Sequence, residues 1–185
     1  MHRRRWLGLG GFLALALMTS ICFAAGGASA SGGLGPDGTS TTSGGGKSDS
    51  SAFPIRGRHS YGDGIGAGRG HQGQDIMSDC GNEVVAARAG RVRFVDYQAS
   101  GAGHYVVVKG KARKDYDYVY MHLLKRLSVR KGERVKAGER IGSVGSTGRS
   151  SACHLHFEMW TAPGWYRGGS IEDPKPFLKR WDRKR

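Results

Sequence analysis

Residues 91–122 read RVRFVDYQASGAGHYVVVKGKARKDYDYVYMH, and this stretch decides the fold class. Its segments 91–97, 104–109 and 116–122 are rich in valine, tyrosine and phenylalanine, the residue types that favour β-strands. Glycines lie between the segments, where they favour turns. The stretch therefore predicts consecutive short strands.

The same pattern extends outward in both directions. Further strands are expected at 83–88 and 153–160, and two short basic strands are expected within 129–144. A hairpin turn is expected at Ala89-Gly90. Only 123–127 favours a helical turn. Many short strands separated by glycine turns predict a mainly β domain, built as a sandwich or a barrel.

The first 30 residues have the pattern of an export signal. A basic start precedes an apolar run at 6–23, and Ala28-Ser29-Ala30 matches the small-residue rule for cleavage. A transmembrane anchor is the alternative, but the run is short, contains glycine and lacks stop-transfer charges. Cleavage near Ala24 and lipidation at Cys22 also remain open. We expect residues 1–30 to be a signal peptide, so that the processed protein is secreted and has no stable membrane span.

Residues 31–52 form a second distinct segment, dominated by glycine, serine and threonine. Such a segment has little apolar surface to bury and is expected to be a flexible linker. Apolar content resumes at Phe53, so 53–185 is expected to be a single folded domain.

The chain is strongly basic. Its formal net charge is +14, and removal of residues 1–30, which hold three arginines and no acid, lowers it to +11. Such a charge favours a polyanionic partner, which for an exported protein means anionic wall polymers; a basic surface that only aids solubility is equally open. No basic helix or aromatic-interleaved basic strand indicates nucleic acid, which we do not expect as a partner.

Apart from Cys22, the chain has two cysteines, Cys80 and Cys153. An even pair in an exported protein predicts one disulfide, and two free buried thiols are the alternative. The disulfide would close a loop of about 70 residues and stabilise the fold by roughly 4 kcal/mol in the chain-entropy model.

The segment His154-Leu155-His156 lies in the last predicted strand. Alternation along a strand places both imidazoles on one face, about 6–7 Å apart, with Leu155 on the core face. We expect the two imidazoles on a solvent-accessible side, where both could bind one metal, or one could bind metal while the other meets substrate. Cys153 would point behind this site, toward a partner such as Cys80.

His71 and Asp75 are four residues apart in a glycine-rich segment. A straight strand would hold them about 13 Å apart, so only a bend near Gly73 could bring both onto one ion. Two histidines and one carboxylate favour zinc and leave one tetrahedral position for water, as in catalytic sites. Without such a bend, His71 is a surface histidine.

His122 ends a predicted strand on which Tyr118 and Tyr120 share its face. We expect this polar and aromatic face to border a groove. His104 and His59 lack comparable settings and are not assigned a function.

Taken together, these segments resemble the M23 peptidase family, of the lysostaphin and LytM type. His71-x-x-x-Asp75 matches the first metal motif of that family, and His154-Leu155-His156-Phe157-Glu158 matches its His-x-His motif. Tyr120-Met121-His122-Leu123 is similar to its central histidine segment. The likeness covers about residues 53–178, and three motifs in this order are specific where each alone is not.

The resemblance implies a mostly antiparallel β core with a groove walled by loops. It implies that His71, Asp75 and His156 bind Zn²⁺ and that His122 and His154 form the catalytic pair. The choice between His154 and His156, which spacing left open, is thus made by the resemblance.

The implied activity is zinc-dependent hydrolysis of peptide stems or cross-links in bacterial peptidoglycan. Zinc would activate a water, and His122 and His154 would act jointly as acid, base and oxyanion stabiliser. Glu158 shares their strand face and is a candidate to orient an imidazole, with a solvated glutamate as the alternative. The other function left open is a non-catalytic, wall-binding activator of other cell-wall hydrolases. A monomeric protein associated with the cell wall is expected.

Overall fold

The computed structural model describes residues 50–68, 70–111 and 116–185. The predicted signal peptide and most of the predicted linker lie outside the described residues. The chain is already paired with the folded domain just before Phe53, because Ala52 N donates a hydrogen bond to Ala87 O and Ser51 forms a β-bridge with Arg88.

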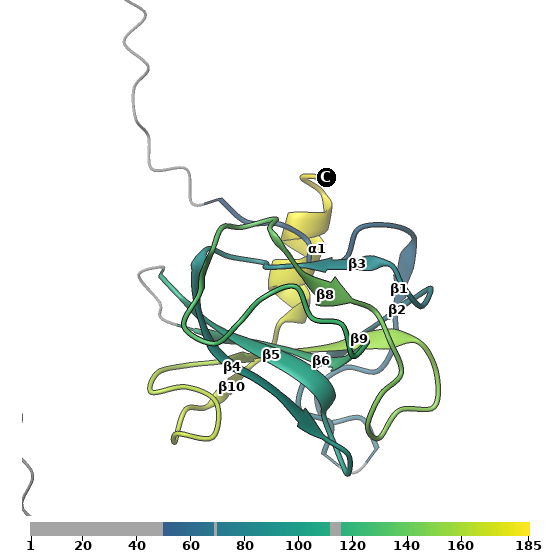
Figure 1. The fold of residues 1–185 in the computed structure, drawn as a ribbon. Coiled ribbons are helices and arrows are strands. Elements are labelled where there is room, and N and C mark those ends of the chain that lie inside the picture. Colours follow the sequence, from purple (N-terminus) through teal and green to yellow (C-terminus); the bar gives the residue numbers. More distant parts are fainter. Residues whose placement is uncertain (1–49, 69, 112–115) are drawn as a thin grey trace, which may run out of the picture. The chain divides into compact units, whose positions relative to one another are not determined.

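The described part consists of short strands and one helix (Figure 1). Its elements are β1 His59–Tyr61, β2 Gln74–Ser78, β3 Glu83–Val85, β4 Gly90–Gln98, β5 Gly103–Gly110, β6 Asp117–Leu123, β7 Arg134–Val135, β8 Arg140–Ser143, β9 His154–Trp160, β10 Ile171–Glu172 and α1 Lys175–Asp182. No helix among the described residues is long and apolar enough to cross a membrane.

Every strand pairing in this domain is antiparallel. The main sheet has the order β1-β2-β9-β6-β5-β4-β7, with β10 paired to β9, and β3 and β8 form a separate two-stranded sheet. This architecture confirms the predicted mainly β, antiparallel fold class. The predicted strands at 91–97, 104–109, 116–122 and 153–160 correspond to β4, β5, β6 and β9.

The hydrophobic core lies between the main sheet, the small sheet and α1, and Figure 1 shows β3, β8 and α1 above the long strands. Side chains from all three parts belong to one buried cluster, among them Val84 of β3, Ile141 of β8, Phe157 of β9 and Trp181 of α1. A smaller cluster, which includes Val107 and Met121, covers the opposite face of the main sheet. One face of the main sheet therefore packs against the main core, and the other carries both this smaller cluster and the candidate site.

Two local predictions were wrong, and one element was missed. Ala89-Gly90 is not a hairpin turn, because β3 pairs with β8 and the chain crosses to the main sheet at this point. Gly90 is instead needed for close packing, since a Cβ there would lie 2.2 Å from Lys109 O. Segment 123–127 is not helical, and the one helix of the described part is α1. Sequence analysis missed α1, although a proline within its first turn is a recognised start signal.

Candidate active site

The candidate site begins where β2 and β9 pair. Asp75 lies directly opposite His156, and Met77 lies opposite His154. Along β9 the side chains alternate as predicted: Leu155 belongs to the core, and the two histidines line a groove on the other face. Strand register therefore joins a carboxylate and an imidazole that are 81 positions apart in sequence.

His71 reaches Asp75 through the bend that the glycine-rich segment predicted. The chain bends at Gly73 immediately before β2, and His71 Nε2 lies 3.0 Å from Asp75 Oδ1. A Cβ at position 73 would lie 2.5 Å from Phe157 O and 2.8 Å from His156 Nε2, so only glycine allows this approach.

The three side chains converge on one point. His156 Nδ1 lies 2.9 Å from Asp75 Oδ1, and the His156 ring meets the His71 ring edge-on, with centroids 4.6 Å apart. One ligand atom from each of His71, Asp75 and His156 lies within 4.8 Å of the others, a spacing that one metal ion could occupy. Two imidazole nitrogens and one carboxylate oxygen are the donor set of catalytic zinc sites.

The outward ring nitrogens of both histidines have hydrogen-bond acceptors. His71 Nδ1 donates to Gly64 O at 2.9 Å, and His156 Nε2 donates to Glu158 Oε1 at 2.9 Å. Each ring therefore keeps its other nitrogen directed at Asp75, where a cation would bind. The residues present fit a divalent metal such as zinc, and Glu158, the candidate for orienting an imidazole, accepts a hydrogen bond from His156.

The charge balance of the cluster points the same way. Burial disfavours the charged form of His156, but its hydrogen bonds to Asp75 and Glu158 outweigh burial and raise its pKa to about 9. Burial likewise opposes ionisation of Asp75, yet the hydrogen bond from His156 and the neighbouring histidines hold its pKa below the ordinary value. The centre thus favours one positive charge between the two carboxylates, and in the metal-binding form that charge is the cation, because ligand imidazoles must be neutral.

His122 and His154 lie beside this centre and face each other. Their ring centroids are 4.8 Å apart, and His154 Nε2 lies 3.6 Å from Asp75 Oδ1. His122 Nδ1 donates to Thr147 O at 2.8 Å, and His154 Nδ1 donates to Ala152 O at 2.9 Å. With both Nδ1 atoms engaged by carbonyl oxygens, both rings keep Nε2 for other partners.

The histidines are less accessible than the sequence analysis expected. His122, His154 and His156 are only 8%, 9% and 7% exposed. The reason is that loops enclose the sheet face and leave a groove. Burial lowers the pKa of His122 to about 4, which keeps its imidazole neutral at physiological pH. The neutral ring carries its proton on Nδ1, which donates to Thr147 O, and leaves Nε2 unprotonated.

The expectation for Tyr118 and Tyr120 was wrong, because both rings are buried in the main core and do not border the groove. Strict alternation would have placed His122 in the core with them. His122 instead has a positive φ of 63°, and the β5–β6 register shifts between His104 and Val106. The left-handed residue exchanges the two faces, so that His122 lines the groove and Leu123 enters the core.

Comparison with known proteins agrees with this geometry. The sequence profile of "Peptidase family M23" matches residues 69–170. The chain belongs to peptidase family M23. This confirms the family resemblance that the three histidine motifs indicated.

Two relatives and one solved structure illustrate the likeness of this M23 domain to others. An uncharacterised metalloprotease of Haemophilus influenzae is 44% identical over 71% of this chain and 29% of its own length. The peptidoglycan DD-endopeptidase ShyC of Vibrio cholerae is 39% identical over 49% of this chain and 20% of its own length. The catalytic domain of lysostaphin from Staphylococcus simulans superposes with a TM-score of 0.59 and 32% identity, covering 65% of this chain and 92% of that domain. The chain spans less than a third of the length of either relative.

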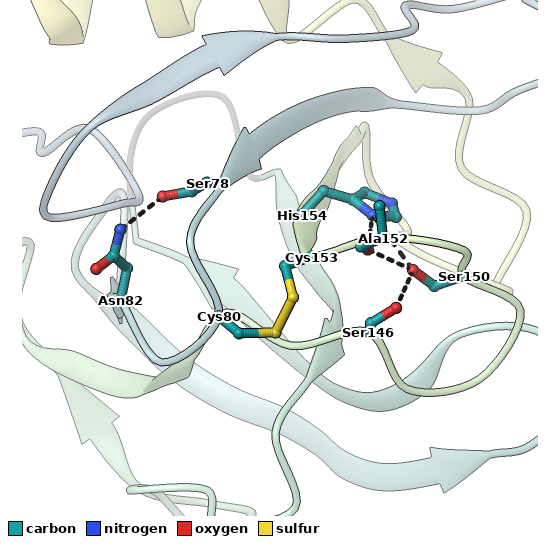
Figure 2. The surroundings of a disulfide bond; sticks show 8 residues. All are labelled: Ser78, Cys80, Asn82, Ser146, Ser150, Ala152, Cys153 and His154. Atoms are coloured by element: carbon teal, nitrogen blue, oxygen red, sulfur yellow. Dashed lines mark hydrogen bonds between the residues drawn. A yellow bond between two sulfur atoms is a disulfide. The ribbon is translucent and has the colours of Figure 1, made fainter.

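A disulfide bond lies behind the groove of the M23 domain, as the sequence predicted. Cys80 and Cys153 are bonded, with their Cα atoms 5.2 Å apart. Figure 2 shows the bond next to His154, whose ring lies on the opposite side of the strand with Ser150 and Ala152. The disulfide therefore anchors the start of β9, one residue before the candidate catalytic histidine.

Sequence analysis missed two residues that support the histidines of the M23 site. Thr147 accepts the His122 hydrogen bond through its carbonyl oxygen, and Trp160 Nε1 donates to Glu158 Oε2 at 2.7 Å. Neither belongs to a recognised motif, although Thr147 lies in the Gly-Ser-Thr-Gly loop before β9. His59 and His104 do not line the groove: His59 stacks on Phe53, and His104 packs against Tyr97.

Proposed function

We propose that this M23 domain is a zinc-dependent endopeptidase that hydrolyses peptide stems or cross-links of bacterial peptidoglycan. The observation that carries the proposal is the convergence of His71, Asp75 and His156 beside the paired rings of His122 and His154. The peptidoglycan substrate follows from the family and from the named activity of a relative, and the groove provides the space for a peptide.

His71, Asp75 and His156 would hold the metal. When bound there, zinc supplies a Lewis acid that activates water and polarises the scissile carbonyl. The two remaining histidines supply proton transfer. In its neutral form, His122 or His154 can accept a proton from the attacking water through Nε2.

The same two rings can serve later in the reaction. A protonated imidazole donates to the oxyanion as it develops, or delivers its proton to the leaving amine. The carbonyl oxygens of Thr147 and Ala152 hold the rings in a fixed tautomer and orientation. Less entropy is then lost in reaching the reactive geometry. We assign these roles jointly to His122 and His154.

Zinc content and cleavage of purified peptidoglycan test the proposal together. We expect about one zinc per chain, release of peptide fragments from peptidoglycan, and loss of that release after chelation. His122→Ala and His154→Ala should each lower the turnover number by at least about 100-fold while zinc is retained. His59→Ala, which removes a ring outside the groove, is the matched control and should retain turnover.

A non-catalytic activator would give a different pattern. Such a protein would bind the wall, release no peptides by itself, and stimulate a separate wall hydrolase equally well with either histidine replaced. That result, or retained cleavage by both histidine variants, would contradict the proposed mechanism.

We also infer that the protein is exported and remains associated with the cell wall. The signal-like residues 1–30, the linker at 31–52 and the disulfide support an extracytoplasmic location. The basic charge supports attraction to anionic wall polymers, which added salt should weaken. The N-terminal residue of the protein recovered from the cell exterior tests the processing site, and recovery of an unprocessed chain in the cytoplasm would contradict export.

A further inference from the structure

A group of aromatic side chains adjoins the groove without taking part in the proposed chemistry. We call Phe94, Tyr105, Trp165 and Tyr166 the aromatic platform; together with Arg167 they line a hollow of their own. The ring centroid of Trp165 lies 6.3 Å from that of Phe94, 5.2 Å from that of Tyr105 and 4.4 Å from that of Tyr166. Trp165 and Tyr166 also line the groove that contains the histidines. The platform is therefore continuous with the candidate active site.

The loop that carries Trp165 and Tyr166 is fixed to the main sheet by an ion pair between Arg93 and the buried Asp117. Asp117, whose side chain is 2% exposed, accepts a hydrogen bond from Arg93 Nη1 at 2.7 Å and from Trp165 N at 3.0 Å. Arg93 Nη1 also donates to Pro163 O at 3.1 Å. A fixed loop loses little conformational entropy when a ligand binds to it.

Tyr166 is the exposed end of the platform. It is 75% exposed, the most of any large apolar side chain in the described residues, and it has a positive φ of 50°. A left-handed conformation is strained for an aromatic residue, and such strain is concentrated at ligand-binding positions. The exposed Tyr166 ring does not pack in the core, and the residue is not a glycine. Neither core packing nor a glycine turn therefore explains its left-handed backbone.

The charges around the platform indicate which ligands it can accept. Arg167 lines the hollow, Lys131 Nζ lies 5.8 Å from the Phe94 ring centroid, and no acidic side chain of the described residues lines the hollow. Among the described residues the charged lining of the hollow is thus cationic, which favours a ligand that offers hydrogen-bond acceptors. A ligand with an apolar C–H face and hydroxyl or amide groups at its edge would stack on the rings and accept hydrogen bonds from Arg167.

We propose that the aromatic platform binds a sugar ring of the peptidoglycan glycan strand while the attached peptide occupies the groove. This inference rests on the proposed function, because it places both parts of one substrate on one surface. It predicts that the domain prefers peptides that still carry their sugar.

The test compares two substrates that share one cross-linked peptide, one with its disaccharide and one without. Because Tyr166 also lines the groove, the expected result is a difference between substrates: Tyr166→Ala should raise KM for the sugar-bearing substrate about three- to tenfold more than KM for the bare peptide, the range expected for one aromatic stacking contact. Tyr166→Phe retains the ring and should behave like the wild type. Tyr97→Ala removes another exposed tyrosine, which is 52% exposed and lines neither the groove nor the hollow, and is the matched control.

Equal losses on both substrates would show that Tyr166 contacts peptide and would overturn the inference, as would no loss on either. If the wild type cleaves neither substrate, the proposed function fails, and a binding titration decides the inference separately. In that titration an N-acetylglucosamine oligosaccharide should quench tryptophan fluorescence in the wild type, and Tyr166→Ala should weaken binding. Absence of quenching and of any binding by calorimetry would overturn the platform as a sugar site.

Discussion

At the level of single residues, Glu158 Oε1 lies 2.9 Å from His156 Nε2, and Glu158 Oε2 lies 2.7 Å from Trp160 Nε1. Both oxygens of this buried carboxylate are therefore occupied by donors. The arrangement determines which nitrogen of His156 carries a proton and which one faces Asp75. Residues that orient a metal ligand in this way typically change metal affinity by 10- to 100-fold when they are replaced.

Glu158→Gln should weaken zinc binding by about 10- to 100-fold, as measured by competition with a chromophoric chelator. Glutamine keeps one acceptor oxygen, but its amide group would meet either His156 Nε2–H or Trp160 Nε1–H with a donor. One of these two buried donors is then left without an acceptor.

A second substitution distinguishes this explanation from general destabilisation. Trp160→Phe removes one of the two competing donors, so Glu158→Gln combined with Trp160→Phe should bind zinc more tightly than Glu158→Gln alone. An unchanged zinc affinity in Glu158→Gln would show that the carboxylate has no part in orienting His156.

At the level of elements, the end of β6 and the loop before β9 hold each other in position. His122 is left-handed at the end of β6, and its ring donates to Thr147 O. Thr147 Oγ1 donates to Leu123 O at 2.8 Å and accepts from His104 N at 2.9 Å. One threonine side chain thus connects the loop to both β5 and β6. The connection lies beside His122, whose left-handed backbone places its own ring in the groove.

Thr147→Val should lower the free energy of unfolding by about 1–3 kcal/mol, because the isosteric methyl group leaves His104 N and Leu123 O without this partner. The turnover number should fall as well, since the carbonyl that orients His122 is no longer held in place. Chemical denaturation and peptidoglycan cleavage measure the two effects. Thr147→Ser retains the hydroxyl and should lie close to the wild type in both; equal behaviour of the valine and serine variants would contradict the prediction.

At the level of the whole molecule, the Cys80–Cys153 disulfide links parts of the chain that are 73 residues apart. The segment between the two cysteines includes β3 to β8 and connects the strands that carry Asp75 and His156. The bond closes this long connection into a covalent loop. In the chain-entropy model, closing a loop of this length lowers the conformational entropy of the unfolded state and so stabilises the fold by about 4 kcal/mol.

Replacing both cysteines with serine should therefore lower the free energy of unfolding by about 4 kcal/mol, as measured by denaturant titration. A reducing agent should destabilise the wild type by a similar amount and should not affect the double variant. Zinc binding by the folded double variant should persist, because the cysteines point away from the ligands. Equal stability of the two proteins would mean that the disulfide constrains a part of the chain that is already ordered before folding.

Much of the fold and the site could be predicted from local patterns. The strands β4, β5, β6 and β9 are rich in valine and aromatic residues, and their positions were predicted to within about two residues. The common face of His154 and His156 follows from alternation along a strand, which is a local property. The pairing of Cys80 with Cys153 followed from the presence of two cysteines outside the predicted signal peptide and from the expectation of export.

Shorter elements could not be predicted in this way. β1, β2 and β10 have few of the residues that favour strands, and they exist because β2 and β10 pair with β9 and β1 pairs with β2. Strands were expected at 83–88 and within 129–144, but the pairing of β3 with β8 likewise joins distant segments and could not be predicted. Pairing between distant segments supplies the stability of these elements, so the local sequence carries little signal for them.

The sequence by itself determined that this is a mainly β domain and which five side chains are candidates for metal binding and proton transfer, because residue composition and motif spacing are properties of short segments. Only the tertiary structure decided that Asp75 lies opposite His156, that a left-handed His122 faces the groove while Tyr118 and Tyr120 are buried, and that Glu158 and Thr147 accept hydrogen bonds from the imidazoles. The physical reason is that strand register, backbone strain and hydrogen bonding to a distant loop depend on neighbours that the chain acquires only when it folds.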